Sequence, residues 1–452
     1  MDVEIISVER IKPSSPTPDH LRYYKHCLLD QLIPADYAPI VIFYPNHDHS
    51  NHFRVLEKLA LLKQSLSETL SRFFPLAGTI RDDLPNLIDC DDQGARFTTA
   101  TVKSCLMSEF LDQSPDLKLI AKFLPCGPTR KGTADSCVTN IQASGFECGG
   151  ICIGVCISHR VLDGASLSTF LKSWADFASP STGERKIVLP DFSASTLFPA
   201  NDWRLKDASM AMWGSMMKEV PFVTKRFVFN GSKIEILKDM ATRLTGDTRP
   251  TRVETVSGFI WKCAMAASSE RCGFKRPSLI THLVNLRRRA TPNLPEESIG
   301  NLTWVASAKC SGGEKENLEL YELVDEVRKC VSRIDGDFVR RLRGDGGFEM
   351  MRECLEDIDG FGCEEDNVDH FGFTSWCKLG FYDVDFGWGR PAWVSSIDAS
   401  GPCFMNLVIL IDDRFGDGME AWVTLDEQEM TVLEQNQEFQ AFVCFNPSPL
   451  NR

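Results

Sequence analysis

Apolar residues recur along this chain at two spacings, one typical of helices and the other of strands. Between residues 54 and 72, leucines return every three or four positions, and this spacing predicts a helix that ends before Pro75. The same criterion predicts helices over residues 164–178, 232–244, 251–267, 318–334 and 427–443. Shorter apolar runs predict strands over residues 76–80, 87–89, 138–143, 151–158, 225–229, 279–286, 302–308, 404–411 and 420–425.

The predicted strands and helices mix without strict alternation, a pattern that indicates an α+β or mixed α/β fold. The chain has 452 residues, more than a single hydrophobic core usually holds, so we expect two domains of similar size. Residues 180–222 show no clear periodicity and contain several prolines, which is typical of a crossover between domains. The predicted division is an N-terminal domain over 1–180, a crossover linker over 181–222 and a C-terminal domain over 223–452.

Composition and net charge narrow the class of protein. Hydrophobic residues make up 43% and charged residues 25% of the chain, as in ordinary soluble globular proteins. A net charge of -14 argues against nucleic acid or an anionic membrane as a partner. The 17 cysteines are odd in number and contain no Cys-x-x-Cys pair, which favours reduced thiols. The chain lacks a signal-peptide pattern and any apolar run near the roughly 20 residues of a membrane span, so we expect a cytoplasmic protein.

The strand predicted over 151–158 leads directly into the most informative group of residues. His159 follows the strand, Asp163 comes four residues later, and Gly164 begins the next predicted helix. A strand end holds an imidazole still, and histidine is mostly neutral and basic at pH 7, so His159 is a candidate general base. The alternative is an ordinary histidine with satisfied hydrogen bonds. His26 and Asp30 share the spacing but lack the strand, the glycine and the helix, so we interpret that pair as coincidental.

Three further histidines, His47, His49 and His52, lie close enough in sequence to suggest a metal site. Neither a cysteine nor another histidine lies nearby in sequence. Asp, Asn and Ser fill the gaps, which is typical of a solvated loop after a strand. We therefore predict a loop here and no metal site in the protein.

The second informative motif is Asp385-Phe386-Gly387-Trp388-Gly389. Together with His159-x-x-x-Asp163-Gly164, it resembles the plant BAHD family of acyl-CoA-dependent acyltransferases. Ser375-Trp376-Cys377, with residues 381–385, is similar to the vinorine synthase-like branch of alkaloid and alcohol acetyltransferases. The Tyr-Phe-Gly-Asn-Cys motif of anthocyanin malonyltransferases is absent. The resemblance covers nearly the whole chain, through residues 11–18, 29–31, 43–45, 74–78, 284–287 and 299–302.

This resemblance implies a fold similar to that of chloramphenicol acetyltransferase, with the reaction channel between two domains and residues 373–395 packing back toward the N-terminal domain. It implies a monomeric O-acyltransferase that moves an acetyl group from acetyl-CoA, as cosubstrate, to a hydroxyl of a plant specialised metabolite, with an alkaloid as the expected acceptor. One alternative is a hydroxycinnamoyl- or other acyl-CoA transferase acting on a different alcohol or amine. Another is a non-catalytic relative that binds a small molecule in the same cleft.

The resemblance also assigns roles at the site. It implies that His159 is the general base, and that Asp163 points away from the reaction and pairs with Arg287. Asp163 would then shape the site, with Gly164, and would not relay charge to the histidine. Trp376 and Thr374 match residues near the transferred acyl group, and an indole N–H or a hydroxyl can donate to an oxyanion. The alternative for Trp376 is simple packing in the core.

The remaining matches concern structure and coenzyme binding. Asp385 and Gly387 correspond to a motif that is structural and distant from the reaction centre. Ser257 and Asn301 match positions expected to contact the coenzyme. The run 287–289 of three arginines either meets the coenzyme phosphates or is a surface run that flanks one buried arginine.

Overall fold

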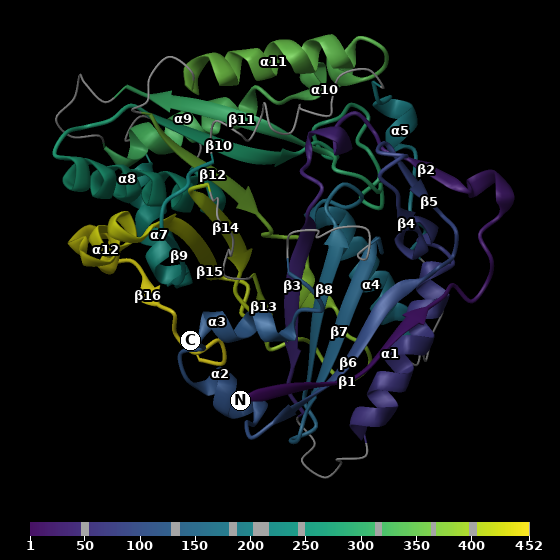
Figure 1. The fold of residues 1–452 in the computed structure, drawn as a ribbon. Helices are drawn as coiled ribbons and strands as arrows, with labels where there is room; N and C mark the ends of the chain where they lie inside the picture. Colours follow the sequence, from purple (N-terminus) through teal and green to yellow (C-terminus); the bar gives the residue numbers. More distant parts are fainter. Residues whose placement is uncertain are drawn as a thin grey trace.

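Two mixed β-sheets, each covered by helices, form the two halves of the molecule (Figure 1). The computed structural model describes residues 1–46, 54–127, 136–179, 188–201, 217–242, 249–311, 319–362, 368–396 and 405–451, without the side chains of Arg54 and 357–362. His47, His49, His52 and most of the predicted crossover 181–222 lie outside these described residues. The division into domains therefore stays a prediction.

The first sheet has six strands in the order β1-β6-β7-β8-β3-β13. Their bounds are β1 Asp2–Ile11, β6 Ala95–Lys103, β7 Thr139–Phe146, β8 Ile151–Ser158, β3 Tyr37–Tyr44 and β13 Trp393–Ser395. β6 and β7 are parallel and the other pairs are antiparallel. Helices α1 (Arg54–Leu70) and α4 (Gly164–Ala178) pack together over one face, where leucines of α1 meet Phe170 and Trp174 of α4 in one buried cluster.

The second sheet has seven strands in the order β11-β10-β12-β14-β15-β9-β16. Their bounds are β11 Thr303–Cys310, β10 Ser278–Asn285, β12 Asp369–Ser375, β14 Leu407–Asp412, β15 Met419–Asp426, β9 Phe222–Phe229 and β16 Cys444–Phe445. The helices of this half are α7 Gly231–Ala241, α8 Arg252–Cys272, α9 Leu320–Ser332, α10 Gly336–Leu342, α11 Gly347–Gly362, α12 Glu427–Gln435 and α13 Gln437–Gln440.

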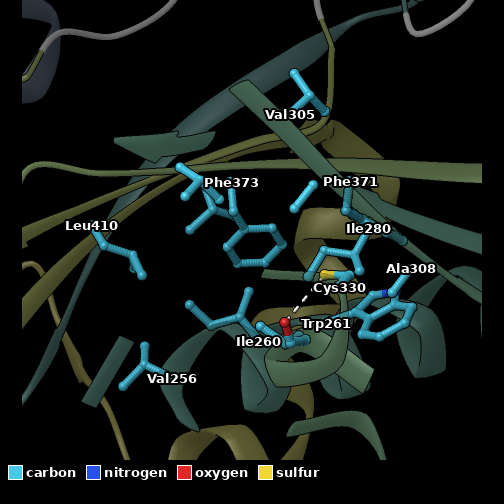
Figure 2. Close-up of a cluster of buried hydrophobic side chains, with 14 of the residues drawn as sticks. Val256, Ile260, Trp261, Ile280, Val305, Ala308, Cys330, Phe371, Phe373 and Leu410 are labelled. Atoms are coloured by element: carbon cyan, nitrogen blue, oxygen red, sulfur yellow. Dashed lines mark hydrogen bonds between the residues drawn. The ribbon is translucent and has the colours of Figure 1, made fainter. Parts of the chain in front are cut away.

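Helix α8 is the centre of the second core. Thr251 and Glu254 form a capping box at its N-terminus, and Gly273 adopts a left-handed conformation (φ 79°) at its C-terminus, which explains both ends of the helix. Figure 2 shows Ile260 of α8 packed among side chains of the sheet, including Phe371 and Phe373. This packing covers the face of the sheet that is turned toward the helices.

The remaining described elements are short. A three-stranded sheet in the order β2-β5-β4 extends the first half, with bounds β2 Tyr23–Lys25, β5 Leu87–Asp89 and β4 Thr79–Ile80. The short helices include α2 Met107–Asp112, α3 Leu117–Ile120 and α5 Ala194–Leu197. Within the described part of the chain, no helix is long and apolar enough to cross a membrane.

Two sequence predictions of local structure are wrong. The strand predicted over 76–80 is too long, because Leu76 and Ala77 belong to a 3-10 turn, Phe74–Ala77, with Pro75 in its first turn, and only Thr79–Ile80 pairs as a strand. The single helix predicted over 427–443 is two helices, α12 and α13. The break occurs at Asn436, whose side-chain oxygen accepts a hydrogen bond from the Phe439 N–H at 2.9 Å and caps the second helix.

Candidate active site

A cavity of about 490 Å³ lies between the two halves of the molecule. The first half contributes residues 33–34, residues 36–39 and the segment that follows β8, and the second half contributes six strands of its sheet. Strand alternation explains the second wall, because Leu407 and Ile409 of β14 face the cavity while Val408 and Leu410 face the helices. Much of the wall is apolar, and its serine and threonine hydroxyls come from Thr224, Thr281, Thr303, Thr374, Ser375, Ser396 and Thr424.

His159 lies in this wall, directly after β8. Its backbone is fixed on both sides, since its N–H donates to the Asp36 carbonyl at 2.9 Å and its carbonyl accepts from the Asn301 side chain at 2.7 Å. The imidazole Nδ1 is buried and has no hydrogen-bond partner among the described residues. Nε2 is therefore the ring nitrogen that can meet a substrate in the cavity.

Asp163 does not serve His159, because other donors occupy both of its carboxylate oxygens. As the N-cap of α4 it accepts the Ser166 N–H at 2.8 Å, and it also accepts the Leu302 N–H at 3.1 Å. The guanidinium of Arg287 binds both oxygens, at 2.7 and 3.1 Å. The ion pair is almost completely buried, and it joins the first half of the molecule to the residues that follow β10 in the second.

The guanidinium of Arg287 likewise has hydrogen-bond partners other than a ligand. Beyond Asp163, its Nη2 donates to the Ser298 carbonyl at 2.7 Å and to the Ser166 hydroxyl at 2.9 Å. The side chain is fully buried, so it cannot reach a coenzyme phosphate without breaking these contacts. Its neighbour Arg288 is exposed and pairs with Glu296 at 2.6 Å. The structure thus favours a surface run that flanks one buried arginine.

Trp376 lies at the cavity beside the start of α4. Its indole packs against Phe381, with ring centroids 5.6 Å apart. A Cβ at Gly164 would lie 3.0 Å from Leu379 Cδ1 and 3.6 Å from Trp376 Cδ1. Glycine after Asp163 therefore lets the Trp376 loop approach the histidine segment closely, which connects two motifs that are far apart in sequence.

Thr374 of β12 also lines the cavity. The structure thus places His159, Trp376 and Thr374 in the wall of one cavity, with Gly164 and Asp163 beside them. A base on one side and N–H or O–H donors on the other are the groups that acyl transfer to a hydroxyl requires.

Ser257 and Asn301 are not among the described residues that line the cavity. Ser257 is fully buried on α8, with its hydroxyl 3.4 Å from His282 Nε2. Asn301 is also buried, and its side chain contacts Asp30 and the His159 backbone. Their assignment to coenzyme binding stays a prediction.

Sequence reasoning missed a second histidine in the cavity wall, His282 of β10. Burial lowers its pKa, so the ring is neutral at pH 7, and it stacks on Phe373 with centroids 6.2 Å apart. Its Nδ1 lies 3.1 Å from the Leu283 carbonyl, which fixes the N–H on that nitrogen. A lone histidine inside an apolar strand gave no signal in the sequence.

The Asp385–Gly389 motif builds a tight turn away from the described cavity wall. The Asp385 carboxylate accepts the N–H groups of Gly387 and Gly389 at 2.8 and 2.9 Å, and both glycines have positive φ, 97° and 104°. Phe386 is fully buried against Trp174 of α4, with ring centroids 5.0 Å apart. The motif therefore ties residues from the second half of the sequence to the first core.

His26, the histidine with the coincidental spacing, lies in the interior and is not among the residues that line the cavity. Burial lowers its pKa to about 3. Because the unfolded chain would take up a proton near pH 6.5 and the folded chain only near 3, His26 should cost stability as the pH falls through this range. The expected slope from this group is about 1.4 kcal/mol per pH unit.

Chemical denaturation of wild type and His26→Ala between pH 6.5 and 4 measures this effect. We expect the wild-type unfolding free energy to fall more steeply with acid than that of the variant. Parallel curves would show that His26 does not titrate in this way.

Comparison with known proteins identifies the family and the fold of this chain. A family model described as the Transferase family matches residues 1–440. A limonoid 7-O-acetyltransferase of Citrus sinensis is 44% identical, and the match covers 100% of both chains. Akuammiline synthase 2 of Alstonia scholaris is 35% identical over 99% of this chain and 98% of that protein. The crystal structure of vinorine synthase matches with a TM-score of 0.80 at 31% identity, covering 99% of this chain and 100% of that one, which confirms the predicted fold class.

Proposed function

This chain belongs to the Transferase family of BAHD acyltransferases and is an acyl-CoA-dependent O-acyltransferase, and we propose that His159 activates a hydroxyl of a bulky, oxygenated polycyclic plant metabolite for acetylation. The observation that carries this proposal is the position of His159 in a largely apolar cavity between the two halves. Acetyl-CoA is the cosubstrate. The acceptor we favour is a limonoid-type alcohol, because the limonoid 7-O-acetyltransferase is 44% identical over the whole chain.

An alkaloid alcohol is the second candidate acceptor. Akuammiline synthase 2, at 35% identity, supports this class. The cavity wall accommodates either class, because apolar residues such as Leu407 and Ile409 can pack against a ring system while the threonine hydroxyls bind its oxygens.

The reaction proceeds by direct attack within a ternary complex. His159 Nε2 takes the proton of the acceptor hydroxyl, and the oxygen bonds to the thioester carbonyl carbon. The tetrahedral oxyanion then collapses, the carbon–sulfur bond breaks, and the protonated His159 returns its proton to the coenzyme A thiolate. The products are an acetyl ester and free coenzyme A. General base catalysis of this kind contributes about 10²–10⁴-fold.

The described cavity wall supports a mechanism without an acyl-enzyme. It contains no cysteine among the described residues, and no hydrogen bond between described residues joins a hydroxyl of that wall to either ring nitrogen of His159. Covalent catalysis needs a nucleophile paired with its base. The acceptor hydroxyl is therefore the group that His159 activates.

The charge of the wall favours acetyl over malonyl transfer. Burying the malonyl carboxylate would require a paired cation, and the described lining residues include no lysine or arginine. In a competition with equal acetyl-, malonyl- and coumaroyl-CoA and one accepted alcohol, we expect the acetyl ester to predominate. A preference for malonyl or coumaroyl transfer would overturn the donor assignment.

Trp376 is our candidate for the oxyanion donor, with Thr374 beside it. Trp376→Phe keeps an aromatic ring at Gly164 but removes the N–H, and we expect kcat to fall about 100-fold with little change in the melting temperature. The matched variant Thr374→Val tests the hydroxyl. An unchanged kcat in Trp376→Phe would make Trp376 a packing residue only.

An acceptor panel tests the proposed function. Purified protein is given acetyl-CoA with limonoid alcohols, alkaloid alcohols or short-chain alcohols, and free coenzyme A and acetyl esters are quantified. We expect ester formation with polycyclic alcohols and the highest kcat/KM among limonoids. Exclusive use of alkaloid alcohols would replace the limonoid assignment, and the absence of any ester with every alcohol would favour a binding protein without catalysis.

We also propose that the protein acts as a monomer in the cytoplasm, without a nucleic-acid or membrane partner. The net charge of -14 supports the absence of anionic partners. Sedimentation equilibrium at micromolar protein should give one species near 50.7 kDa, and a species of twice this mass would contradict the monomer.

A further inference from the structure

One buried side chain connects the catalytic segment of the first half with the second half of the molecule. Asn301 lies between β10 and β11, and its amide nitrogen donates to the His159 carbonyl at 2.7 Å and to Asp30 Oδ1 at 2.9 Å. Only 1% of Asn301 is exposed. The amide donors of Asn301 are thus directed at the backbone of the base and at a buried carboxylate.

Asp30 is the acceptor that orients Asn301. It is fully buried, and besides the Asn301 side chain it accepts the Asn301 N–H at 2.7 Å on Oδ1 and the Cys27 N–H at 2.7 Å on Oδ2. Because N–H donors approach both oxygens, an amide at this position would turn one acceptor into a donor. Burial raises the pKa of Asp30 to about 6, so the carboxylate is kept at an energetic cost.

The residues on either side of Asn301 contact the other end of the segment that runs from His159 to Ser166. Gly300 accepts from the Ser166 hydroxyl at 3.1 Å, and Leu302 donates to Asp163 at 3.1 Å. Residues 300–302 therefore contact the segment at Asp163 and at His159. The Asp163 contacts fix the start of α4, whereas Asn301 fixes the peptide group of the base itself.

We propose that Asp30 and Asn301 are positioning residues that hold the His159 backbone so that its imidazole meets the acceptor hydroxyl. This inference rests on the proposed role of His159 as the base, and it replaces coenzyme contact as the role of Asn301. Displacing a catalytic group by about 1 Å can cost about 100-fold in rate. Loss of the Asn301 donor should therefore lower kcat without changing how acetyl-CoA binds.

Steady-state kinetics of Asn301→Ala separate the two roles of this residue. We expect kcat to fall about 10- to 100-fold while KM for acetyl-CoA stays within about twofold of wild type. The control is Asn436→Ala, which removes a helix cap at a residue that is not among those lining the cavity, and which should lower stability without lowering kcat. A raised KM for acetyl-CoA at unchanged kcat would restore the coenzyme role of Asn301 and overturn the proposal. Unchanged values of both kcat and KM would also overturn the proposal.

Exchanging the two side chains distinguishes positioning from simple stabilisation. In the double variant Asp30→Asn with Asn301→Asp, the pair can still hydrogen-bond, but residue 301 can no longer donate to the His159 carbonyl. We expect the melting temperature to recover relative to Asn301→Asp alone, while kcat stays low. Recovery of kcat together with stability would mean that the pair acts only through stability.

Hydrogen–deuterium exchange gives a readout that does not depend on acetyl transfer. In Asn301→Ala, amides of residues 158–163 should exchange faster than in wild type, and in Asn436→Ala they should not. If wild type acetylates no alcohol, the proposed function fails, but the exchange experiment still tests whether Asn301 holds the His159 backbone. Unchanged exchange at residues 158–163 in Asn301→Ala would refute this positioning role.

Discussion

Replacing His159 with alanine should lower kcat for acetyl transfer at least about 100-fold and leave the fold intact. The loss is expected because the side chain supplies the base in the cavity wall. The fold should survive because the Asp36 and Asn301 hydrogen bonds engage the backbone of residue 159 and remain in the variant. Rates should be measured at saturating acetyl-CoA, with circular dichroism on the same samples.

His26→Ala is the matched control. His26 has the same spacing to an aspartate as His159, but His26 is not among the residues that line the cavity. We expect this variant to lose stability but to keep near-normal kcat per folded molecule. A folded His159→Ala protein with near-normal turnover would refute the assignment of His159 as the base.

Asp163→Asn should have the second large effect, on stability as well as on rate. The amide would place a donor against Arg287, Ser166 N–H or Leu302 N–H, and it would leave a fully buried guanidinium without its counter-charge. Breaking one partner of a buried ion pair costs about 3–5 kcal/mol. The rate should fall too, because Asp163 holds the far end of the segment that carries His159. Urea unfolding and kcat measure the two effects.

Arg288→Ala provides the control for an arginine in an ion pair. Arg288 pairs with Glu296 at the surface, and exposed pairs of this kind contribute at most about 1 kcal/mol. We therefore expect a much smaller loss of stability and an unchanged kcat. Comparable losses in Arg288→Ala and Asp163→Asn would contradict the special role of the buried pair.

The parts of the fold that could be predicted are those with local signals. The strand before His159 and the helix after Asp163 have clear apolar periodicity, and the structure contains both as β8 and α4. Strand β1 gave no such signal. Ile5 is 60% exposed and Val8 is 50% exposed, and the strand forms by pairing with β6. A strand that depends on a distant partner cannot be recognised from its own sequence.

At the site, too, residues in recognisable motifs could be predicted from the sequence, whereas residues defined by long-range contacts could not. His159, Trp376 and Thr374 were selected from motifs, and they line one cavity. The role that the structure suggests for Asn301 was not accessible, because its contacts to His159 and Asp30 span 142 and 271 residues of sequence. His282 was missed because a histidine buried in a strand has no characteristic spacing. Long-range hydrogen bonds of this kind become visible only when the two halves are assembled.

The central claim is that this protein moves an acetyl group directly from acetyl-CoA to an acceptor hydroxyl. A single-turnover experiment with excess protein, acetyl-CoA and an accepted polycyclic alcohol tests it most directly, with mass spectrometry of both the small molecules and the intact protein. We expect one acetyl ester for each coenzyme A released and no acetyl group on the protein at any time. A stable acetyl group on the protein, or coenzyme A release without an acetyl ester, would contradict the account.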